Sequence, residues 1–357
     1  MNLKELRSEL KECGYFKKRP GRIVVELILH VTLALGGIAV FVTADSILVR
    51  IVAIVVSSLG SMGVGTNTHT SSHYGTSRRR WVDEYLTYFG YPLFLGLSST
   101  YWHYMHVVRH HPAPNVMGKD TDHDLMPWFS IIRKQFEGTT GLRRFYYEHF
   151  QWILFPIALS LNGFNMQKAG WTYLIRSLSD PRARKKAHYL DLMAMLLYYL
   201  VWIGLPAFFF PLTDVLLFNV IRITLMGYAM FAVLAPGHFP EEATCYEEAD
   251  LKEANFAFLQ ASSSINFRTG IFGRFVCSGL EFQIEHHLFP KLSHVYYPQV
   301  ARHVEDFCRK NGYPCRTLGW GEAIWKSFMV FRTPKGVEQE LVLPDGDSLP
   351  SLPPESS

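Results

Sequence analysis

The sequence predicts an all-α integral membrane protein, in which four transmembrane helices form two hairpins and carry a cytosolic helical cap. Two observations predict this class. The mean hydropathy of the 357-residue chain is only +0.06, yet the apolar residues are concentrated in long runs, as in membrane spans joined to a polar body. These runs also form two closely spaced pairs, and the connection within each pair is very short.

Four runs are long enough to cross a bilayer, since a helical span needs about 20 residues. The first contains one charge, Glu26, near its start, and the fourth is interrupted by Arg222. The predicted spans are residues 23–44, 48–68, 192–213 and 215–237. The predicted parts of the chain are an N-terminal cytosolic segment at 1–22, a membrane domain at 23–315, and a C-terminal extension at 316–357 whose tail from 342 is expected to be disordered.

The charges around the spans predict their orientation. The two connections, Asp45-Ser46 and Thr213-Asp214, contain no Lys or Arg. Basic residues gather at the other ends of the spans, so the positive-inside rule puts both termini in the cytosol. Shorter apolar segments at 85–102 and 150–164 are expected to be interfacial or half inserted. The basic positions are Lys4, Arg7, Lys11, Lys17, Lys18, Arg19, Arg22, Arg78, Arg79, Arg80, Arg182, Arg184, Lys185 and Lys186.

Composition argues against several other classes. The net charge is only +4, and no basic patch with interleaved aromatic residues indicates a nucleic-acid partner. The five cysteines are odd in number and lack CxxC spacing, which argues against a disulfide framework or a zinc ribbon. Residues 1–22 carry too many charges, and the following apolar run is too long, for a cleavable signal peptide.

Closely spaced histidines are the main candidates for chemistry. Histidines four apart share one face of a helix, whereas adjacent histidines point about 100° apart and can serve two different metal ions. With 15 histidines in the chain, a triple such as the second group is expected by chance only about 0.03 times. The groups are His69 with His73; His106 with His110 and His111; and His286 with His287, three residues after Gln283.

All three groups, with His238 after the fourth span, fall on the same predicted side of the membrane. Structural histidines would have no reason to gather there. Eight neutral imidazoles are too many for one metal ion, and two ions with open positions need about this number. Histidine suits iron, zinc, copper and nickel, but only a redox-active metal such as iron can activate dioxygen, since zinc has no redox chemistry.

The three groups resemble the histidine boxes of the membrane-bound fatty acid desaturase family. Residues 279–290, GLEFQIEHHLFP, are very similar to the third box of its front-end and acyl-lipid branch, in which Gln replaces the first histidine. Residues 106–115, HVVRHHPAPN, are similar to the second box, and an acidic stretch with Asp120 and Asp122 follows it as in relatives. His238 lies where many members carry an extra ligand. The resemblance covers about residues 23–315.

The resemblance implies a four-span fold with a di-iron centre that desaturates an acyl chain, carried on a lipid or on CoA, with O2 and two supplied electrons. The expected ligands are His69, His73, His106, His110, His111, His238, His286 and His287. Gln283 and Asn266 are expected to orient ligands by hydrogen bonding, with Asp120 and Asp122 in a similar role.

Two features depart from the family pattern. The first box reads HTSSH, where relatives often have Asp after the first histidine. The sequence also lacks the His-Pro-Gly-Gly signature of a fused haem domain, so we expect a separate electron carrier, of the cytochrome b type or a ferredoxin. The expected location is the endoplasmic reticulum membrane in a eukaryote, or the inner or plasma membrane in a bacterium.

Other functions remain open at the level of sequence. A hydroxylase on the same di-iron scaffold shares the first hydrogen abstraction and differs only in the fate of the substrate radical. A membrane metal transporter would place histidines or acids at mid-membrane depth, and only His30 and Arg222 are predicted there. A receptor would not need eight metal ligands. His188 and His303 are not expected to bind metal.

Overall fold

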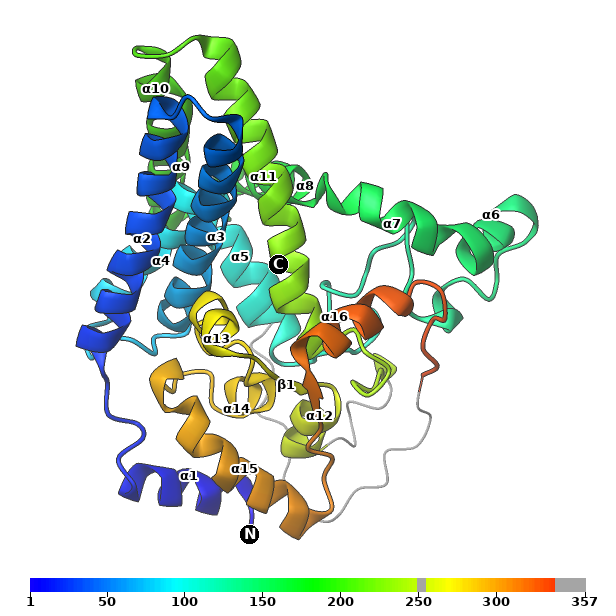
Figure 1. The fold of residues 1–357 in the computed structure, drawn as a ribbon. Helices are drawn as coiled ribbons and strands as arrows, with labels where there is room; N and C mark the ends of the chain where they lie inside the picture. Colours follow the sequence, from blue (N-terminus) through cyan, green and yellow to red (C-terminus); the bar gives the residue numbers. More distant parts are fainter. Residues whose placement is uncertain (249–254, 338–357) are drawn as a thin grey trace.

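The computed structural model describes residues 1–248 and 255–337, and four long apolar helices dominate it (Figure 1). Each is long and apolar enough to cross a membrane, which confirms this part of the predicted fold class. These spans are α2 (Pro20–Thr43), α3 (Ile47–Ser72), the continuous helix Lys186–Ala207 and the continuous helix Leu212–Gly237. The predicted disordered tail at 342–357 lies outside the described residues.

Helices α2 and α3 pack closely because small residues line their contact. Gly37 and Gly60 bring the two backbones together: a Cβ on Gly60 would lie 2.4 Å from the backbone nitrogen of Ala34. Ser57 donates from Oγ to the Ala34 carbonyl oxygen at 2.7 Å. Small residues permit this approach between apolar helices, where van der Waals contact and interhelical hydrogen bonds stabilise the pair.

The third span differs in position from the apolar run at 192–213. Helix α9 (Lys186–Tyr199) continues through the π-turn η5 (Leu200–Gly204) into α10 (Leu205–Ala207), and the connection to α11 (Leu212–Leu234) lies at 208–211. Thr213 and Asp214, expected to form that connection, belong to the first turn of α11. Pro211 directly precedes α11, and Asp214 in its first turn complements the positive end of the helix dipole.

The apolar segment at 85–102 forms a broken helix. Helix α4 (Arg80–Gly90) continues into the π-turn η1 (Tyr91–Leu95), which ends at Gly96 in the left-handed conformation, φ +66°. After a break at residues 96–98, α5 (Ser99–Trp102) continues into the π-helix η2 (His103–His110). Residues 80–110, which follow the second span, therefore form two half-helices that meet at a turn.

A second set of helices extends sideways from the long helices (Figure 1). The segment at 150–164 is divided, because α7 (Gln151–Leu159) ends before α8 (Asn162–Ser179) begins. Ile153, Leu154 and Ile157 of α7 are exposed, as expected where a helix meets lipid. The shorter elements that precede α7 are η3 (Arg133–Gln135), α6 (Gly141–Phe145) and η4 (Tyr146–Phe150).

The remaining elements form a compact body at the end of the long helices that lies opposite their short connections (Figure 1). Its core includes Leu6 and Leu10, which pack against Val300, Val304 and Phe307. Two short strands pair in parallel, with Asn266 opposite Thr317. The elements are α1 (Leu3–Glu12), η6 (Ala235–Gly237), α12 (Phe256–Ser262), β1 (Asn266–Arg268), α13 (Ile271–Cys277), α14 (Gln283–Leu288), η8 (His294–Tyr296), α15 (Tyr297–Asn311), β2 (Thr317–Gly319) and α16 (Trp320–Met329).

Candidate metal centre

Eight buried histidines converge where the long helices meet this body. Four separate parts of the chain supply them: the end of α3, the end of η2, the turn after η6, and α14. They form two adjacent groups, each of which could hold a metal ion. The first group is His69, His73, His106, His111 and His286, and the second is His110, His238 and His287.

The first group, here called the quintet, is joined through its Nε2 atoms. His69 Nε2 lies 3.0 Å from His286 Nε2 and 3.3 Å from His106 Nε2. His111 Nε2 lies 3.1 Å from His106 Nε2. One ligand nitrogen from each of the five rings lies within 4.8 Å of all the others, so the five rings surround one point.

The second group, here called the trio, is also joined through Nε2. His287 Nε2 and His238 Nε2 lie 3.1 Å apart. The ring centroid of His110 is 4.7 Å from that of His238 and 5.0 Å from that of His287. The two groups touch, because the adjacent residues His286 and His287 lie in different groups with ring centroids 5.4 Å apart. This division of an adjacent pair agrees with the geometry expected of a helix.

The second histidine group is divided differently from the expectation. In an α-helix, His106 and His110 would share one face, but the chain here forms a π-helix, and the amide of His111 donates to the His106 carbonyl oxygen at 3.0 Å. The wider turn brings His111 beside His106 in the quintet and directs His110 to the trio. Such π-turns are rare and occur often at functional sites.

The outer nitrogens of the trio have fixed protonation. His110 Nδ1 donates to Asp120 Oδ2 at 3.0 Å, His287 Nδ1 to Gln260 Oε1 at 2.9 Å, and His238 Nδ1 to the Ser263 carbonyl oxygen at 3.1 Å. Gln260 also donates from Nε2 to the His111 carbonyl oxygen, which fixes the orientation of its amide. Because these partners accept, each Nδ1 carries a proton, and in a neutral ring Nε2 then presents a lone pair inward.

This arrangement fits a bound cation. His238 and His287 direct two lone pairs at each other across 3.1 Å in a buried site, which is repulsive unless a positive charge lies between them. In the quintet, His73 Nε2 is buried without a hydrogen-bond partner. Outer acceptors that hold the Nδ1–H of histidines and leave Nε2 free are the usual second layer of a metal site. The residues present therefore fit two metal ions.

The electrostatics favour neutral ligands in most positions. Burial, with the neighbouring histidines, holds the pKa of His106, His111, His286 and His287 well below the usual value. His110 differs: burial lowers its pKa, but the charge and hydrogen bond of Asp120, with help from Asp122, raise it overall to about 9. A neutral imidazole is the form that binds a metal.

The four predicted orienting residues have different surroundings. Asp120 contacts the site directly, because its Oδ2 accepts from His110 Nδ1; the same oxygen also accepts from His123 Nδ1 at 2.9 Å. Asp122 Oδ2 is 3.7 Å from His110 Nδ1, but the side chain is 41% exposed. Asn266 donates to Glu285 Oε2 at 2.9 Å, and Gln283 donates to the Leu280 carbonyl oxygen at 2.8 Å. Those two side-chain bonds end on residues other than the eight histidines.

Sequence reasoning missed several residues that contact the histidines. Tyr91 and Tyr297 place their hydroxyls 3.0 Å from His69 Nδ1 and 3.2 Å from His286 Nδ1. Gln260 holds His287, and the buried Lys335 donates to the carbonyl oxygens of His238, Pro240 and Ala243. None of these lies at a fixed spacing from a histidine box, so no sequence signal identifies them.

The histidines that the sequence analysis leaves out of the site have other partners. His303 donates from Nδ1 to Glu9, and His188 accepts from the backbone amide of Lys185. His30 is buried between α2 and α3 and stacks on Phe275, with ring centroids 4.0 Å apart. None of the three belongs to a histidine group that could hold a metal among the described residues.

The fold and the site define a mostly helical protein with four membrane-length helices and a buried histidine cluster that could hold metal. The comparisons identify the family. Residues 45–319 match the model of the fatty acid desaturase family, so the chain belongs to that family.

Curated relatives agree with this assignment. The chain is 24% identical to a Delta(5) fatty acid desaturase of Caenorhabditis elegans, over 78% of this chain and 62% of that protein. It is 26% identical to an acyl-lipid (9-3)-desaturase of Physcomitrium patens, over 87% and 58%, and 26% identical to an sn-1 linoleoyl-lipid 6-desaturase of Synechocystis, over 61% and 62%. The chain thus spans about six tenths of the length of these relatives.

The outer layer of the trio can be tested through Gln260. We expect Gln260→Leu to lower metal affinity by about 10–100-fold, because the Nδ1–H of His287 loses its acceptor. The exposed Gln299 of α15 provides the matched control, and Gln299→Leu should bind metal as the unaltered protein does. Metal content after dialysis against a graded chelator series measures the effect. Equal retention in both variants would contradict the role of Gln260.

Proposed function

We propose that this protein is an oxygen-dependent fatty acyl desaturase that uses two iron ions held by the eight histidines. The observation that carries the proposal is the pair of adjacent histidine groups with inward Nε2 atoms, in a chain of the desaturase family. Iron bound there would supply the redox chemistry that activates O2 and removes hydrogen from an unactivated C–H bond. The protein's own contribution is to hold the histidine rings and their acceptors in place in a buried site.

The same geometry supports the assignment of iron over a structural zinc. A structural zinc site is closed by four ligands, whereas here five and three histidines form two touching groups. Fewer protein ligands in the trio leave room for other molecules on that side. Imidazole ligands also suit copper and nickel, so the identity of the metal rests on membership of the family.

We place the four long helices across the membrane as two hairpins, with the histidine centre and both termini on the cytosolic side. The basic clusters support this orientation by the positive-inside rule. The site then lies at the membrane surface, where it can receive an acyl chain from the bilayer. A metal transporter is less well supported, because the metal-binding histidines lie at helix ends and not at mid-membrane depth.

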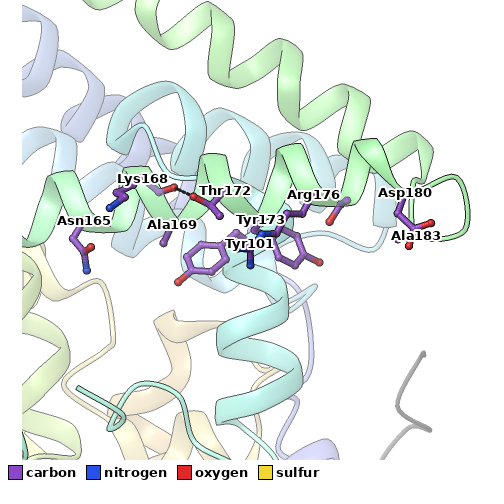
Figure 2. Close-up of a pocket in the computed structure, with 10 residues that line it drawn as sticks. Tyr101, Asn165, Lys168, Ala169, Thr172, Tyr173, Arg176, Asp180 and Ala183 are labelled. Atoms are coloured by element: carbon purple, nitrogen blue, oxygen red, sulfur yellow. Dashed lines mark hydrogen bonds between the residues drawn. The ribbon is translucent and has the colours of Figure 1, made fainter. Parts of the chain in front are cut away.

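A cleft beside the centre is the proposed place for the polar end of the substrate. It has a volume of about 550 Å³ and lies along α8, where it faces Tyr101 of α5 (Figure 2). Lys168, Thr172 and Arg176 line it with Tyr173, and in the described part of the chain neither cation forms an ion pair. Tyr101 directly precedes Trp102, whose ring stacks on His106 with centroids 4.6 Å apart.

The relatives suggest what the cleft receives. The names of two of them specify acyl-lipid and linoleoyl-lipid substrates. We therefore propose an acyl chain carried on a phospholipid, with its phosphate near Lys168 and Arg176; an acyl-CoA is the second candidate, since it also carries phosphates. A guanidinium is well suited to bind phosphate through paired hydrogen bonds.

The reaction can be tested in cells through matched histidine variants. We expect expression of the unaltered protein to add a double bond to an acyl chain, and His287→Ala to abolish the new product and to lower the iron content. His303→Ala, outside the metal groups, should retain both. Gas chromatography with mass spectrometry of total lipids measures the outcome. A hydroxylated acyl product would establish the hydroxylase alternative, and full activity of His287→Ala would exclude the proposed site.

The cleft can be tested by steady-state kinetics in lipid nanodiscs. We expect Arg176→Ala to raise the apparent KM about 10-fold or more for the correct carrier with a smaller change in kcat, because a charged hydrogen bond to phosphate is lost. Lys310→Ala, an exposed cation on α15, should leave both constants unchanged. Phospholipid and acyl-CoA substrates are compared side by side. An unchanged KM for both carriers would show that the cleft does not bind the polar end.

We also propose that electrons arrive from a separate, acidic carrier protein that docks on the cytosolic basic surface. Arg78 and Arg79 are exposed there. Complementary charge mainly raises the association rate and is screened by salt. We expect turnover with a limiting carrier to fall as salt rises, and Arg79→Glu to raise the apparent KM for the carrier. Arg302→Glu on α15 is the control, and salt-independent turnover with an unaffected Arg79→Glu enzyme would contradict the docking surface.

A further inference from the structure

The break in the helix between residues 80 and 110 leaves two helix ends facing each other inside the protein. One half-helix, α4 with η1, ends at Leu95, and the other, α5 with η2, begins at Ser99. The first end exposes carbonyl oxygens and the partial negative charge of the helix dipole. The second exposes amides and the partial positive charge. Because the break is buried, water cannot satisfy these groups freely, so side chains must do so.

Three buried side chains satisfy the carbonyl end. Trp202 Nε1 donates to the Leu93 carbonyl oxygen at 2.6 Å, Arg222 Nη1 to that of Phe94 at 3.0 Å, and Gln167 Nε2 to that of Leu95 at 2.9 Å. The donors come from three different helices, η5, α11 and α8. The three consecutive carbonyl oxygens of Leu93, Phe94 and Leu95 thus each accept a hydrogen bond from a side chain of another helix.

Arg222 is the central member of this set. It is fully buried, and its guanidinium lies 3.5 Å from the ring centroid of Trp202. It also donates to Tyr198 Oη at 2.8 Å and to Ser61 Oγ at 3.2 Å. Within residues 1–248 and 255–337 no carboxylate forms an ion pair with it. The negative end of the α4–η1 dipole takes the place of a carboxylate, which explains why a cation is stable at this depth.

A carboxylate satisfies the opposite end. Asp191 of α9 is fully buried and accepts from the backbone amides of Ser99 at 3.0 Å and Thr100 at 2.8 Å. It also accepts from the hydroxyls of Ser98 and Thr100, each at 2.6 Å. Anions at a helix N-terminus are stabilising in the same way that cations are at a C-terminus. The third and fourth spans thus hold the two ends of the break with opposite charges.

The half-helices held in this way carry side chains of the metal centre. Tyr91 of η1 contacts His69 Nδ1, and its ring stacks on Trp102 of α5 with centroids 4.9 Å apart and planes 26° apart. Trp102 in turn stacks on His106. The helix that begins at Ser99 goes on to supply His106 and His110. A shift of the first helix end would therefore move Tyr91 away from His69. A shift of the second would move the helix that carries His106 and His110.

We propose that Arg222 and Asp191 are positioning residues that clamp the two ends of the broken helix and thereby set the geometry of the metal centre. Among the described residues, neither forms a hydrogen bond with any of the eight histidines of the metal centre and neither lines the cleft, so both act through the helix ends that they hold. This inference rests on the proposed metal site but is independent of which acyl substrate the protein uses. It predicts that changing the charge of Arg222 or Asp191 alters the metal affinity, although neither residue binds the metal.

The experiment uses the full chain in nanodiscs with two readouts that need no catalysis. Hydrogen exchange of a peptide covering residues 93–101 should become about 10-fold faster in Arg222→Met, because the loss of a hydrogen bond from a charged donor loosens the break. Cobalt(II) titration, followed by its visible absorption, should show affinity lower by about 10–100-fold and a changed spectrum. Asp191→Asn should change the same peptide and spectrum.

Matched variants separate positioning from general stability. Arg50 of α3 donates to the Ala44 carbonyl oxygen and forms no hydrogen bond with the broken helix among the described residues, so Arg50→Met should leave both readouts unchanged. Arg222→Lys keeps the charge without the planar stack on Trp202, and it should recover part of the cobalt affinity. It also serves where Arg222→Met fails to fold. Activity with the acyl substrate should fall through kcat, with KM changed by less than about 3-fold.

The outcome that overturns the proposal is a cobalt spectrum and affinity equal to those of the unaltered protein in Arg222→Met and Asp191→Asn, with unchanged exchange at 93–101. Loss of thermal stability alone would also overturn it, because a purely structural arginine predicts that result. A different result would separate the two proposals. If the variants lose cobalt affinity as expected but the unaltered protein makes no desaturated product, the proposed function is contradicted and the positioning role is supported.

Discussion

The convergence of eight imidazoles in a buried site is the constraint on which the rest of the structure depends. Neutral rings whose outer nitrogens are already bound to acceptors, as in the trio, direct lone pairs at one another across 3.1 Å. That arrangement is unfavourable without a cation, and it holds its shape only if each ring is fixed from behind. Asp120 supplies this support from one segment, and Gln260 and Ser263 supply it from α12 and its C-terminal end, so distant parts of the chain must meet at one place.

The membrane-length helices also help to fix the histidine rings. Irregular backbone beside a histidine centre is useful because it aims side chains, but it exposes polar groups that lipid cannot satisfy. The chain meets this with buried donors and acceptors, of which Arg222 and Asp191 are the charged examples. Close packing at Gly37 and Gly60 serves a related purpose, since it holds α3 in register and so determines where His69 and His73 emerge from the end of that helix.

Departures from regular α-helical geometry occur where function concentrates. The π-helix η2 places His111 beside His106 at one metal position and His110 at the other, whereas in a regular α-helix His106 and His110 would share one face. The π-turn η1 places Tyr91 against His69. Wider turns are energetically less favourable than α-turns and persist where surrounding contacts require them. Here those contacts are the stacked rings of Tyr91, Trp102 and His106.

The sequence by itself determined the features that depend on local composition and spacing. Runs of about 20 apolar residues gave the four long helices, and the dense histidine groups gave the eight rings that meet. It could not give the third span's ends, because the prolines near 206 and 211 and the dipole of α11 outweigh hydropathy there. The sequence also could not predict that His106 and His110 belong to different histidine groups, because the hydrogen bonding of a π-helix depends on how the helix packs.

Only the tertiary structure decided which residues support the centre. Gln260 and Lys335 contact the histidine segments from 27 and 97 residues away in the chain, and contacts between distant positions leave no periodic pattern. Arg222 was visible in the sequence as a charge in an apolar run, but its partner is a helix end and not a residue of opposite charge. A helix dipole exists only after the helix has formed and broken at the right place, so only the folded chain reveals it.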